Sequence, residues 1–291
     1  MTNLTGFVNI IKPTGMSSSD VVCKVKKILK TKKVGHLGTL DPAASGVLPV
    51  AVGKATKFFD YFLTKDKEYI AVVNFGIETD TLDGFGNITN SNTKVIDFAS
   101  IKQVIPNFIG KIKQVPPKYS AIKINGKRAC DLAREDIAFE IKAREITIFD
   151  VQVLRDFGNN MFLFKVHCSA GTYIRTLFSD IAYALGTVST TSVIIRTKSG
   201  RFLMNDAITL DMLVANSKIV EIETLFADYD KIEVNDFIAR KLINGVKIEF
   251  EVLNVQKNNG EEFFISYKNK TIGLYKVVNK KLETIVFLYE N

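Results

Sequence analysis

The run of glycine and proline residues at 35–50 constrains this chain more than any other stretch of its sequence. Its three glycines allow positive φ and a close approach of the backbone, while Pro42 fixes φ and removes a hydrogen-bond donor. The residue before a proline favours an extended backbone, so Asp41 is expected in a stiff loop and not in a helix. The apolar residues 46–52 are expected to form a buried strand or the start of a helix. A carboxylate on such a loop can act in catalysis, whereas an isolated Asp-Pro pair more often makes a turn with a capping carboxylate.

The order of residues in this run resembles the catalytic motif of the TruB-type tRNA pseudouridine synthases. The resemblance is carried by Gly-His-Leu-Gly-Thr-Leu-Asp-Pro at 35–42 and by Ser-Gly-Val-Leu-Pro at 45–49. In that family the aspartate is the nucleophile, so the resemblance implies that Asp41 is catalytic. It also implies that His36 takes the space of the flipped-out base and that Gly38 belongs to the substrate-binding loop.

The charge balance of the chain favours a polyanionic partner. Lys and Arg number 39 against 31 Asp and Glu, which gives a formal net charge of +8 and an isoelectric point near 9.2. Such a balance suits nucleic acid or a membrane surface without choosing between them. A Lys-rich composition can also arise from genome base composition.

Cysteine usage and hydropathy point to a cytoplasmic protein that does not bind membranes. Cys23, Cys130 and Cys168 lie far apart and form no Cys-x-x-Cys pair, so neither a disulfide framework nor a cysteine-rich zinc site is expected. No apolar stretch approaches the roughly 20 residues that span a bilayer, and residues 1–5 lack the features of a signal peptide. We therefore expect a soluble chain in a reducing compartment.

The first apolar segment is expected to end beside the Asp41 loop. Residues 6–11 are typical of a short strand, and Lys12-Pro13-Thr14-Gly15 is a turn signal. The segment resembles the family's first motif, which implies that Lys12 and Pro13 support the catalytic loop without taking part in the chemistry.

A basic helix is expected next, over residues 19–30, because polar residues at 17–20 supply N-cap side chains. Six lysines lie between residues 24 and 33 and would place positive potential beside the Asp41 loop. Among them, Lys26 and Lys30 are expected to contact RNA phosphates. A solvated helix face is the commoner meaning of such a run.

Residues 67–77 are expected to form a core strand, and residues 79–84 a polar turn. Together they resemble the family's next motif, whose tyrosine stacks on the target uracil. The resemblance therefore assigns Tyr69 to the face of the base, where its ring can stack and its hydroxyl can transfer a proton. Taken alone, Tyr69 would more often be an ordinary strand aromatic.

An inserted segment over about residues 114–143 is expected to clamp RNA. It follows a predicted helix at 100–110, and its first part, residues 114–121, resembles another family signature. The Asn-Gly pair at 125–126 is a hairpin signal, and a basic helix is expected over 129–134. A surface hairpin without a partner is the alternative.

A second polar cluster precedes a helix that is expected to run to Leu185, after strands at about 144–155 and 161–168. Arg175 falls in the first turn of this helix, where a cation opposes the helix dipole and needs another reason to be present, such as a carboxylate partner. In the family the matching arginine pairs with the catalytic aspartate. The resemblance also places Tyr173 at the substrate.

His167 and Cys168 are not expected to converge on one site, because neighbouring side chains of a strand point to opposite faces. Core packing is expected for both.

The stretch after this helix departs from the family pattern. Ile194 keeps an apolar residue, which the resemblance places at the substrate, but an arginine expected next to it is Ile195. An expected Ala-His pair is replaced by Ser189-Thr190. The departure concerns contacts with RNA and not the chemistry.

The remainder of the chain is expected to form a helix at 207–215 and then a small second domain. A composition shift sets the predicted boundary between a catalytic domain, 1–228, and a C-terminal domain, 229–291. The latter is expected to hold a short helix at 236–243 and four β-rich runs after it, the pattern of a small β-barrel. It resembles the PUA-type RNA-binding domain found on this family.

The resemblance spans about residues 6–205 and implies an α+β fold, with a mixed, mostly antiparallel pseudouridine-synthase sheet and flanking helices. It implies isomerisation of uridine 55 in the T-arm stem-loop of tRNA by a monomer that needs no cofactor and no metal. The chain contains neither a Walker-type phosphate loop nor a dinucleotide-binding fingerprint.

Several alternatives stay open at this point. Asp41 could attack C6 of uracil, attack C1′ of ribose, or act as a base at the sugar. A non-catalytic RNA-binding protein could share the scaffold, although an intact set of Asp41, Tyr69 and Arg175 argues against it. A hydrolase could use Asp41 with His36 or His167, but it would normally need a metal or a second catalytic carboxylate, and no motif for either is evident.

Overall fold

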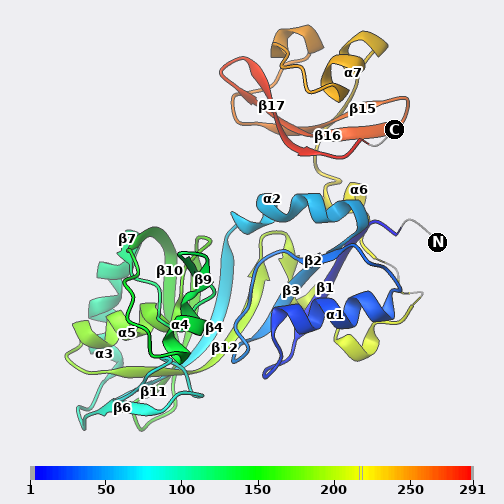
Figure 1. The fold of residues 1–291 in the computed structure, drawn as a ribbon. Coiled ribbons are helices and arrows are strands. Elements are labelled where there is room, and N and C mark those ends of the chain that lie inside the picture. The colour runs from blue at the N-terminus through cyan, green and yellow to red at the C-terminus, as the bar shows by residue number, and fades with distance from the viewer. Residues whose placement is uncertain (1–3, 216, 218, 290–291) are drawn as a thin grey trace.

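The computed structural model describes residues 4–215, 217 and 219–289, and its main element is a nine-stranded sheet (Figure 1). The strand order is β1-β3-β12-β4-β11-β10-β7, with β2 on β3 and β13 on β12. β3 and β12 pair in parallel, and the other pairs are antiparallel. The α+β prediction with a mostly antiparallel sheet is therefore confirmed. The strands are β1 (Gly6–Lys12), β2 (Val34–His36), β3 (Ser45–Val52), β4 (Lys67–Phe75), β7 (Gly110–Gln114), β10 (Arg144–Asp156), β11 (Met161–Cys168), β12 (Ser189–Ser199) and β13 (Phe202–Leu203).

Helices cover one face of this sheet and enclose the larger core. The apolar sides of α1, α3 and α5 pack against the buried side chains of β1, β3, β4 and β11. On the opposite face, α2 covers the end of the sheet formed by β1 and β3. The helices are α1 (Ser18–Ile28), α2 (Phe59–Leu63), α3 (Phe98–Val104), α4 (Ala129–Arg134), α5 (Ile174–Ala184), α6 (Ile222–Leu225) and α7 (Asp236–Ile243).

Local signals set several of these elements as expected. Ser17 begins α1 with a capping box, in which its side chain accepts from the Asp20 N–H while the Asp20 carboxylate accepts from the Ser17 N–H. Residues 46–52 form part of strand β3, which decides between the two predictions for that run. The Asn-Gly turn joins β8 (Lys123–Ile124) to β9 (Lys127–Arg128). A second small hairpin, β5 (Ile77–Thr79) with β6 (Ile88–Ser91), follows β4.

The helix predicted over 207–215 is wrong, and the helix predicted over 100–110 is too long. The first stretch holds only a 3₁₀ turn at Leu210–Met212, and Ile208, near its start, pairs with strand β1 instead of joining a helix. The second ends as α3 at Val104 and continues as a 3₁₀ turn over Ile105–Phe108 before β7 begins.

The outer edge of β1 is covered by chain that comes much later in the sequence. The Phe7 N–H donates to the Val220 carbonyl oxygen at 2.7 Å, and the Val220 N–H donates back at 2.8 Å. Ile208 makes two further hydrogen bonds with β1, to Asn9 and Ile11. The edge of the sheet at β1 is thus paired by irregular segments and not left open.

The C-terminal part forms a second sheet of four strands, in the order β14-β15-β16-β17. These are β14 (Lys231–Glu233), β15 (Glu262–Tyr267), β16 (Lys270–Val278) and β17 (Lys281–Phe287). Four strands are predicted after α7, but within the described residues only β15, β16 and β17 follow it. The remaining strand of the sheet, β14, precedes the helix. The sheet and α7 enclose a core of their own.

A hydrophobic cluster packs the C-terminal sheet onto α2, which lies between the two sheets in Figure 1. Beside it, Glu262 Oε2 accepts from the Tyr61 and Tyr229 hydroxyl groups at 3.0 and 2.7 Å. The domain boundary after residue 228 stays a prediction, since this packing crosses it. Within the described residues, no helix is both long and apolar enough to cross a bilayer.

Candidate active site

A cavity of about 420 Å³ opens where the Asp41 loop, β4, β12 and the start of α5 meet. This volume lies in the range of small-ligand pockets, about 300–1,000 Å³. The cavity brings together residues that lie far apart in the sequence. Six of the predicted site residues line it: Gly38, Asp41, Tyr69, Tyr173, Arg175 and Ile194.

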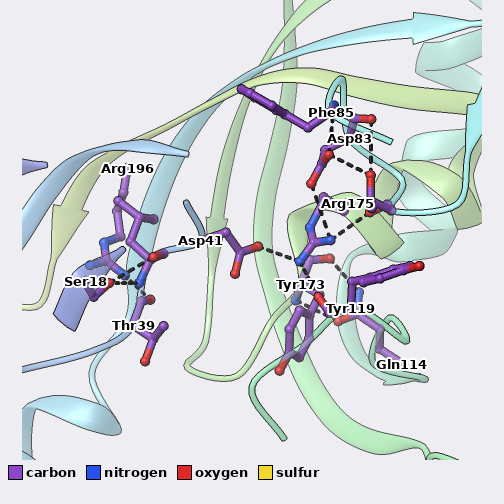
Figure 2. A network of polar contacts seen from close by, with 12 residues as sticks. Ser18, Thr39, Asp41, Asp83, Phe85, Gln114, Tyr119, Tyr173, Arg175 and Arg196 are labelled. Atoms are coloured by element: carbon purple, nitrogen blue, oxygen red, sulfur yellow. Dashed lines mark hydrogen bonds and ion pairs between the residues drawn. The ribbon is translucent and has the colours of Figure 1, made fainter. Parts of the chain in front are cut away.

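The backbone of the Asp41 loop is held at every carbonyl oxygen from residue 38 to residue 42. The Arg196 guanidinium donates to the Gly38 and Thr39 oxygens, each at 3.1 Å. The Ser18 hydroxyl bonds both polar backbone groups of Leu40 at 2.9 Å (Figure 2). Because these bonds come from two separate elements, β12 and α1, the loop has little freedom to shift.

The same loop is fixed at its far end by a hydrogen bond within the loop and by two bonds from the predicted first motif. The Asp41 carbonyl oxygen accepts from the Ala44 N–H at 3.1 Å. The Pro42 oxygen accepts from the Gly15 N–H at 2.8 Å and from Lys12 Nζ at 3.4 Å. Lys12 is fully buried, and burial lowers the pKa of its ammonium to about 8, although Asp41 opposes the shift.

Asp41 is paired with Arg175 across the cavity. Arg175 Nη2 donates to Asp41 Oδ2 at 2.6 Å, and the same nitrogen donates to the Tyr119 carbonyl oxygen at 3.0 Å. Arg175 is 3% exposed at its side chain, whereas Asp41 is 36% exposed, so the carboxylate faces the open side of the pair. A carboxylate partner explains why a cation occurs in the first turn of α5.

A second carboxylate, Asp83, lies against the same arginine and was not singled out from the sequence. Asp83 Oδ2 is 3.5 Å from Arg175 Nη1, which also donates to the Thr81 carbonyl oxygen at 2.7 Å (Figure 2). Asp83 is buried, and its other oxygen accepts from Thr81 Oγ1 at 2.7 Å and from the Phe85 N–H at 3.1 Å. The Arg175 guanidinium therefore has two carboxylate partners, the buried Asp83 and the solvent-facing Asp41.

Tyr69 forms part of the cavity wall from strand β4. Its side chain points to the helix-covered face of the sheet, beside Ile194, and burial raises the pKa of its hydroxyl to about 12. The hydroxyl is therefore protonated at neutral pH and can donate a hydrogen bond.

Tyr173 is held by Gln114, another residue that sequence reasoning missed. The Gln114 side chain accepts from the Tyr173 N–H at 2.8 Å and donates to the Tyr173 carbonyl oxygen at 3.1 Å. Gln114 is 1% exposed and ends β7, at the first residue of the predicted insertion. It thus joins the insertion to the start of α5.

The remaining predicted residues lie outside the cavity wall. His36 lies on β2, its Nδ1 is buried without a hydrogen-bond partner, and burial together with the Arg196 charge lowers its pKa. Pro13 is exposed beside the loop. Lys26 lies on α1 and is half-buried, whereas Lys30 lies just after α1 and is exposed.

His167 does not pack in the core as predicted. Its Nε2 lies 2.7 Å from Asp66 Oδ2 on the partly exposed face of the sheet, whereas Cys168 is fully buried on the other face. Neither histidine lines the cavity with Asp41, which removes the basis for the hydrolase alternative.

The charged groups of the cavity wall are mostly cations. Asp41 is the one carboxylate among the lining residues of the described chain, against five cations: Lys67, Lys123, Arg144, Arg175 and Arg196. Lys67 is 6% exposed, and burial lowers the pKa of its ammonium to about 8. Such a wall favours an anionic ligand or one that gains negative charge.

Comparison with known proteins gives a consistent result over nearly the whole chain. Residues 26–174 match the family model described as TruB family pseudouridylate synthase (N terminal domain). The chain is 41% identical over 276 residues to tRNA pseudouridine synthase B of Clostridium kluyveri, which covers 93% of this chain and 95% of that relative. It is 42% identical over 287 residues to tRNA pseudouridine synthase B of Clostridioides difficile, with 93% of each covered. Among solved structures, it resembles a chain of a Cbf5-Nop10-Gar1 complex with a TM-score of 0.71 and 28% identity, over 98% of this chain and 84% of that chain.

Proposed function

The chain belongs to the TruB family of pseudouridylate synthases, and we propose that Asp41 is the group with which it attacks or deprotonates its substrate. It is a tRNA pseudouridine synthase, an isomerase that converts a uridine of tRNA to pseudouridine. We further propose that the target is uridine 55 in the T-arm stem-loop, and that the enzyme acts as a monomer in the cytoplasm.

The ion pair between Asp41 and Arg175 in the wall of the cavity is the observation that carries this proposal. Arg175 is almost fully buried, so its guanidinium fixes the orientation of the carboxylate, while the exposed side of Asp41 stays available to a substrate. Tyr69 and Ile194 provide aromatic and apolar surface in the same cavity, which suits a flat base.

The isomerisation breaks the N1–C1′ bond of uridine and forms a C5–C1′ bond. The hydrogen on C5 leaves to solvent, and N1 gains a proton, so no electrons are gained or lost. The base must leave the stack of the RNA loop to reach the cavity, at a cost of a few kcal/mol that stacking and pocket contacts offset. In this proposal Tyr69 stacks on the base, Arg175 holds Asp41, and Tyr173, Ile194 and Gly38 contact the nucleotide.

The three possible actions of Asp41 remain distinct in their bonds. Attack at C6 of uracil forms a covalent bond to the base, attack at C1′ forms one to the sugar, and action as a base removes a sugar proton. In each case the protonated hydroxyl of Tyr69 can give a proton but cannot take one at the start.

Basic surface outside the cavity is proposed to bind RNA phosphates. Lys26 and Lys30 belong to the lysine-rich side of α1, and the insertion over 114–143 adds Lys123 at the cavity rim. His36 would fill the space of the extruded base, while Lys12 and Pro13 support the loop, as the bond from Lys12 to Pro42 suggests.

Tritium release from tRNA labelled at C5 of uridine 55 alone tests the proposed function. Wild type should release tritium, and Asp41→Asn should not, although it should bind tRNA with the affinity of wild type. A tRNA labelled at C5 of a uridine outside the T-loop is the control for position and should release none.

Each result decides one part of the proposal. Release by Asp41→Asn at the wild-type rate would exclude Asp41 as the reactive group. Release only from the control tRNA would exclude the T-loop position, and absence of release from both would leave an RNA-binding protein on this scaffold. Sedimentation of the active enzyme at a mass above 32.5 kDa would exclude the monomer.

A further inference from the structure

Arg196 is a buried cation without a carboxylate partner. It is 1% exposed, and no carboxylate in the described part of the chain forms an ion pair with it. Its guanidinium instead donates to three carbonyl oxygens: those of Val47 at 2.8 Å, Thr39 at 3.1 Å and Gly38 at 3.1 Å. Buried charges are normally paired, because removing an ion from water is costly. An unpaired cation at this depth therefore needs a reason beyond packing.

The position of Arg196 in the sheet links both sides of the cavity. It lies opposite Tyr69 in the register of β12 with β4, and opposite Gly46 in the register of β12 with β3. From this position its side chain reaches the loop that presents Asp41, as Figure 2 shows. One residue thus connects the loop with the carboxylate to the strand with the tyrosine.

Gly46 permits this arrangement. Its φ is +104°, and a Cβ atom there would lie 2.3 Å from the Arg196 carbonyl oxygen and 2.8 Å from the Arg196 nitrogen. Since such contacts are not tolerated, only glycine allows β3 to approach β12 this closely. The close approach places Val47, the next residue of β3, where its carbonyl oxygen can accept from Arg196 Nε.

We propose that Arg196 is a positioning residue for the reaction: its guanidinium locks the Asp41 loop to β12, the strand paired with the one that carries Tyr69, and its unpaired charge acts on the groups around the cavity. The proposal rests on the proposed function, because it concerns the geometry of the same two residues. A planar guanidinium can bond the adjacent oxygens of Gly38 and Thr39 at once, which the single ammonium of a lysine cannot do in the same geometry.

The charge of Arg196 is felt by groups on both sides of the cavity. Burial is the main reason that the pKa of His36 is lowered, and the Arg196 cation lowers it further. For Tyr69, burial raises the pKa of the hydroxyl and the Arg196 cation opposes that rise. The cation thus favours a neutral His36 and eases the loss of a proton from Tyr69.

Single-turnover rates at saturating tRNA test the positioning role. Arg196→Lys keeps the positive charge but loses the planar guanidinium that bonds several oxygens at once. Its single-turnover rate should fall about 100-fold, which is the effect of a misplacement near 1 Å. Its Kd for tRNA should stay within about threefold of wild type. The single-turnover rate of Arg196→Met should fall by at least the same factor. Lys198→Met is the matched control, since Lys198 lies on the same strand but pairs with Asp66 and Glu68 at the surface, and its rate should equal that of wild type.

The split between rate and affinity decides the outcome. A rate for Arg196→Lys within twofold of wild type would overturn the positioning role, as would a loss confined to the Kd for tRNA. Because Arg196→Met could fail to fold, tRNA binding and the unfolding temperature of each variant are measured first. If Arg196→Met proves to be unfolded, the rate of Arg196→Lys alone decides the test.

The titration of His36 by NMR gives a readout that needs no turnover. The chain has only two histidines, so their ring signals are separated by the spectrum of one His36→Gln variant. The pKa of His36 should rise toward 6.5 in Arg196→Met and stay near that of wild type in Arg196→Lys, while His167 should not change. An unchanged His36 in Arg196→Met would overturn the electrostatic role. If wild type itself released no tritium, the proposed function would fail, and this titration would still test the effect of Arg196.

Discussion

Ser18 holds Leu40 by both polar groups of its backbone. The Ser18 hydroxyl donates to the Leu40 carbonyl oxygen and accepts from the Leu40 N–H, each at 2.9 Å. Both residues are buried, and Leu40 directly precedes the carboxylate of the site. The first turn of α1 therefore determines where the Asp41 loop lies.

Replacement of Ser18 by alanine should lower stability and activity together. It leaves the buried N–H and carbonyl of Leu40 without partners, at a cost of about 1–3 kcal/mol in the free energy of unfolding. Ser19→Ala, at the exposed neighbouring position, is the control and should stay within about 0.5 kcal/mol of wild type. Urea unfolding and single-turnover tritium release measure the two effects. A Ser18→Ala protein as stable as Ser19→Ala would show that the loop does not depend on this contact.

Asp83→Asn should slow the reaction without weakening tRNA binding. The substitution keeps the shape of the side chain but removes the buried charge beside Arg175, so the guanidinium loses one of its two carboxylates. Because the orientation of Asp41 depends on that guanidinium, we expect the single-turnover rate to fall by about tenfold or more. The control is Asp80→Asn, an exposed acid of the same turn. Equal rates for the two variants would contradict this role of Asp83.

The buried ammonium of Lys12 should make stability depend on pH. Its pKa is about 8 in the folded protein against 10.5 for an ordinary lysine, so the unfolded chain binds more protons between these values. The free energy of unfolding of wild type, relative to Lys12→Met, should therefore rise from about pH 7.5 to about pH 9.5, by on the order of 1 kcal/mol. Urea unfolding at both pH values measures it, with Lys24→Met as the exposed control. A difference that is constant or falls with pH would contradict the shift.

The lysines of α1 should contribute to the salt dependence of tRNA binding. If Lys26 and Lys30 each contact a phosphate, replacing both by alanine should weaken binding and reduce the slope of log Kd against log salt by up to about 2. Fluorescence titrations at several salt concentrations give the slope. Lys102→Ala on α3 removes an exposed lysine elsewhere and is the control. If the double variant keeps the wild-type slope, this side of α1 is a solvated helix face.

The sequence predicted the pairing of Asp41 with Arg175 but not the contacts that hold this ion pair. Asp41 and Arg175 stand in dense local motifs, and the unfavourable place of a cation in the first turn of α5 already indicated a carboxylate partner. Asp83 shares a polar turn with other acidic and hydroxyl residues, so nothing in its local sequence distinguishes it. Its role depends on a contact between residues more than ninety positions apart, which periodicity cannot reveal.

Arg196 and residues 207–215 show the same limit. Arg196 occupies an ordinary strand position, and only the register of β12 with two other strands brings it to the loop. Residues 207–215 have a helical pattern, but the backbone of Ile208 pairs with β1 and only a 3₁₀ turn forms after it, so tertiary pairing overrides local preference. Similarly, His167 and Cys168 lie on opposite faces of the sheet as predicted, but the alternation of side chains does not reveal which of the two faces is exposed to solvent.

The pairing of Val220 with Phe7 has a consequence for the newly made chain. β1 leaves the ribosome before the other strands of its sheet, but the residues that cover its outer edge are made only after nearly all of the large sheet. At about 5–20 residues per second, that interval lasts on the order of ten seconds or more. During it, an apolar strand with free N–H and carbonyl groups is a template for aggregation, so translation and chaperone capture compete with misassembly until residue 220 has emerged.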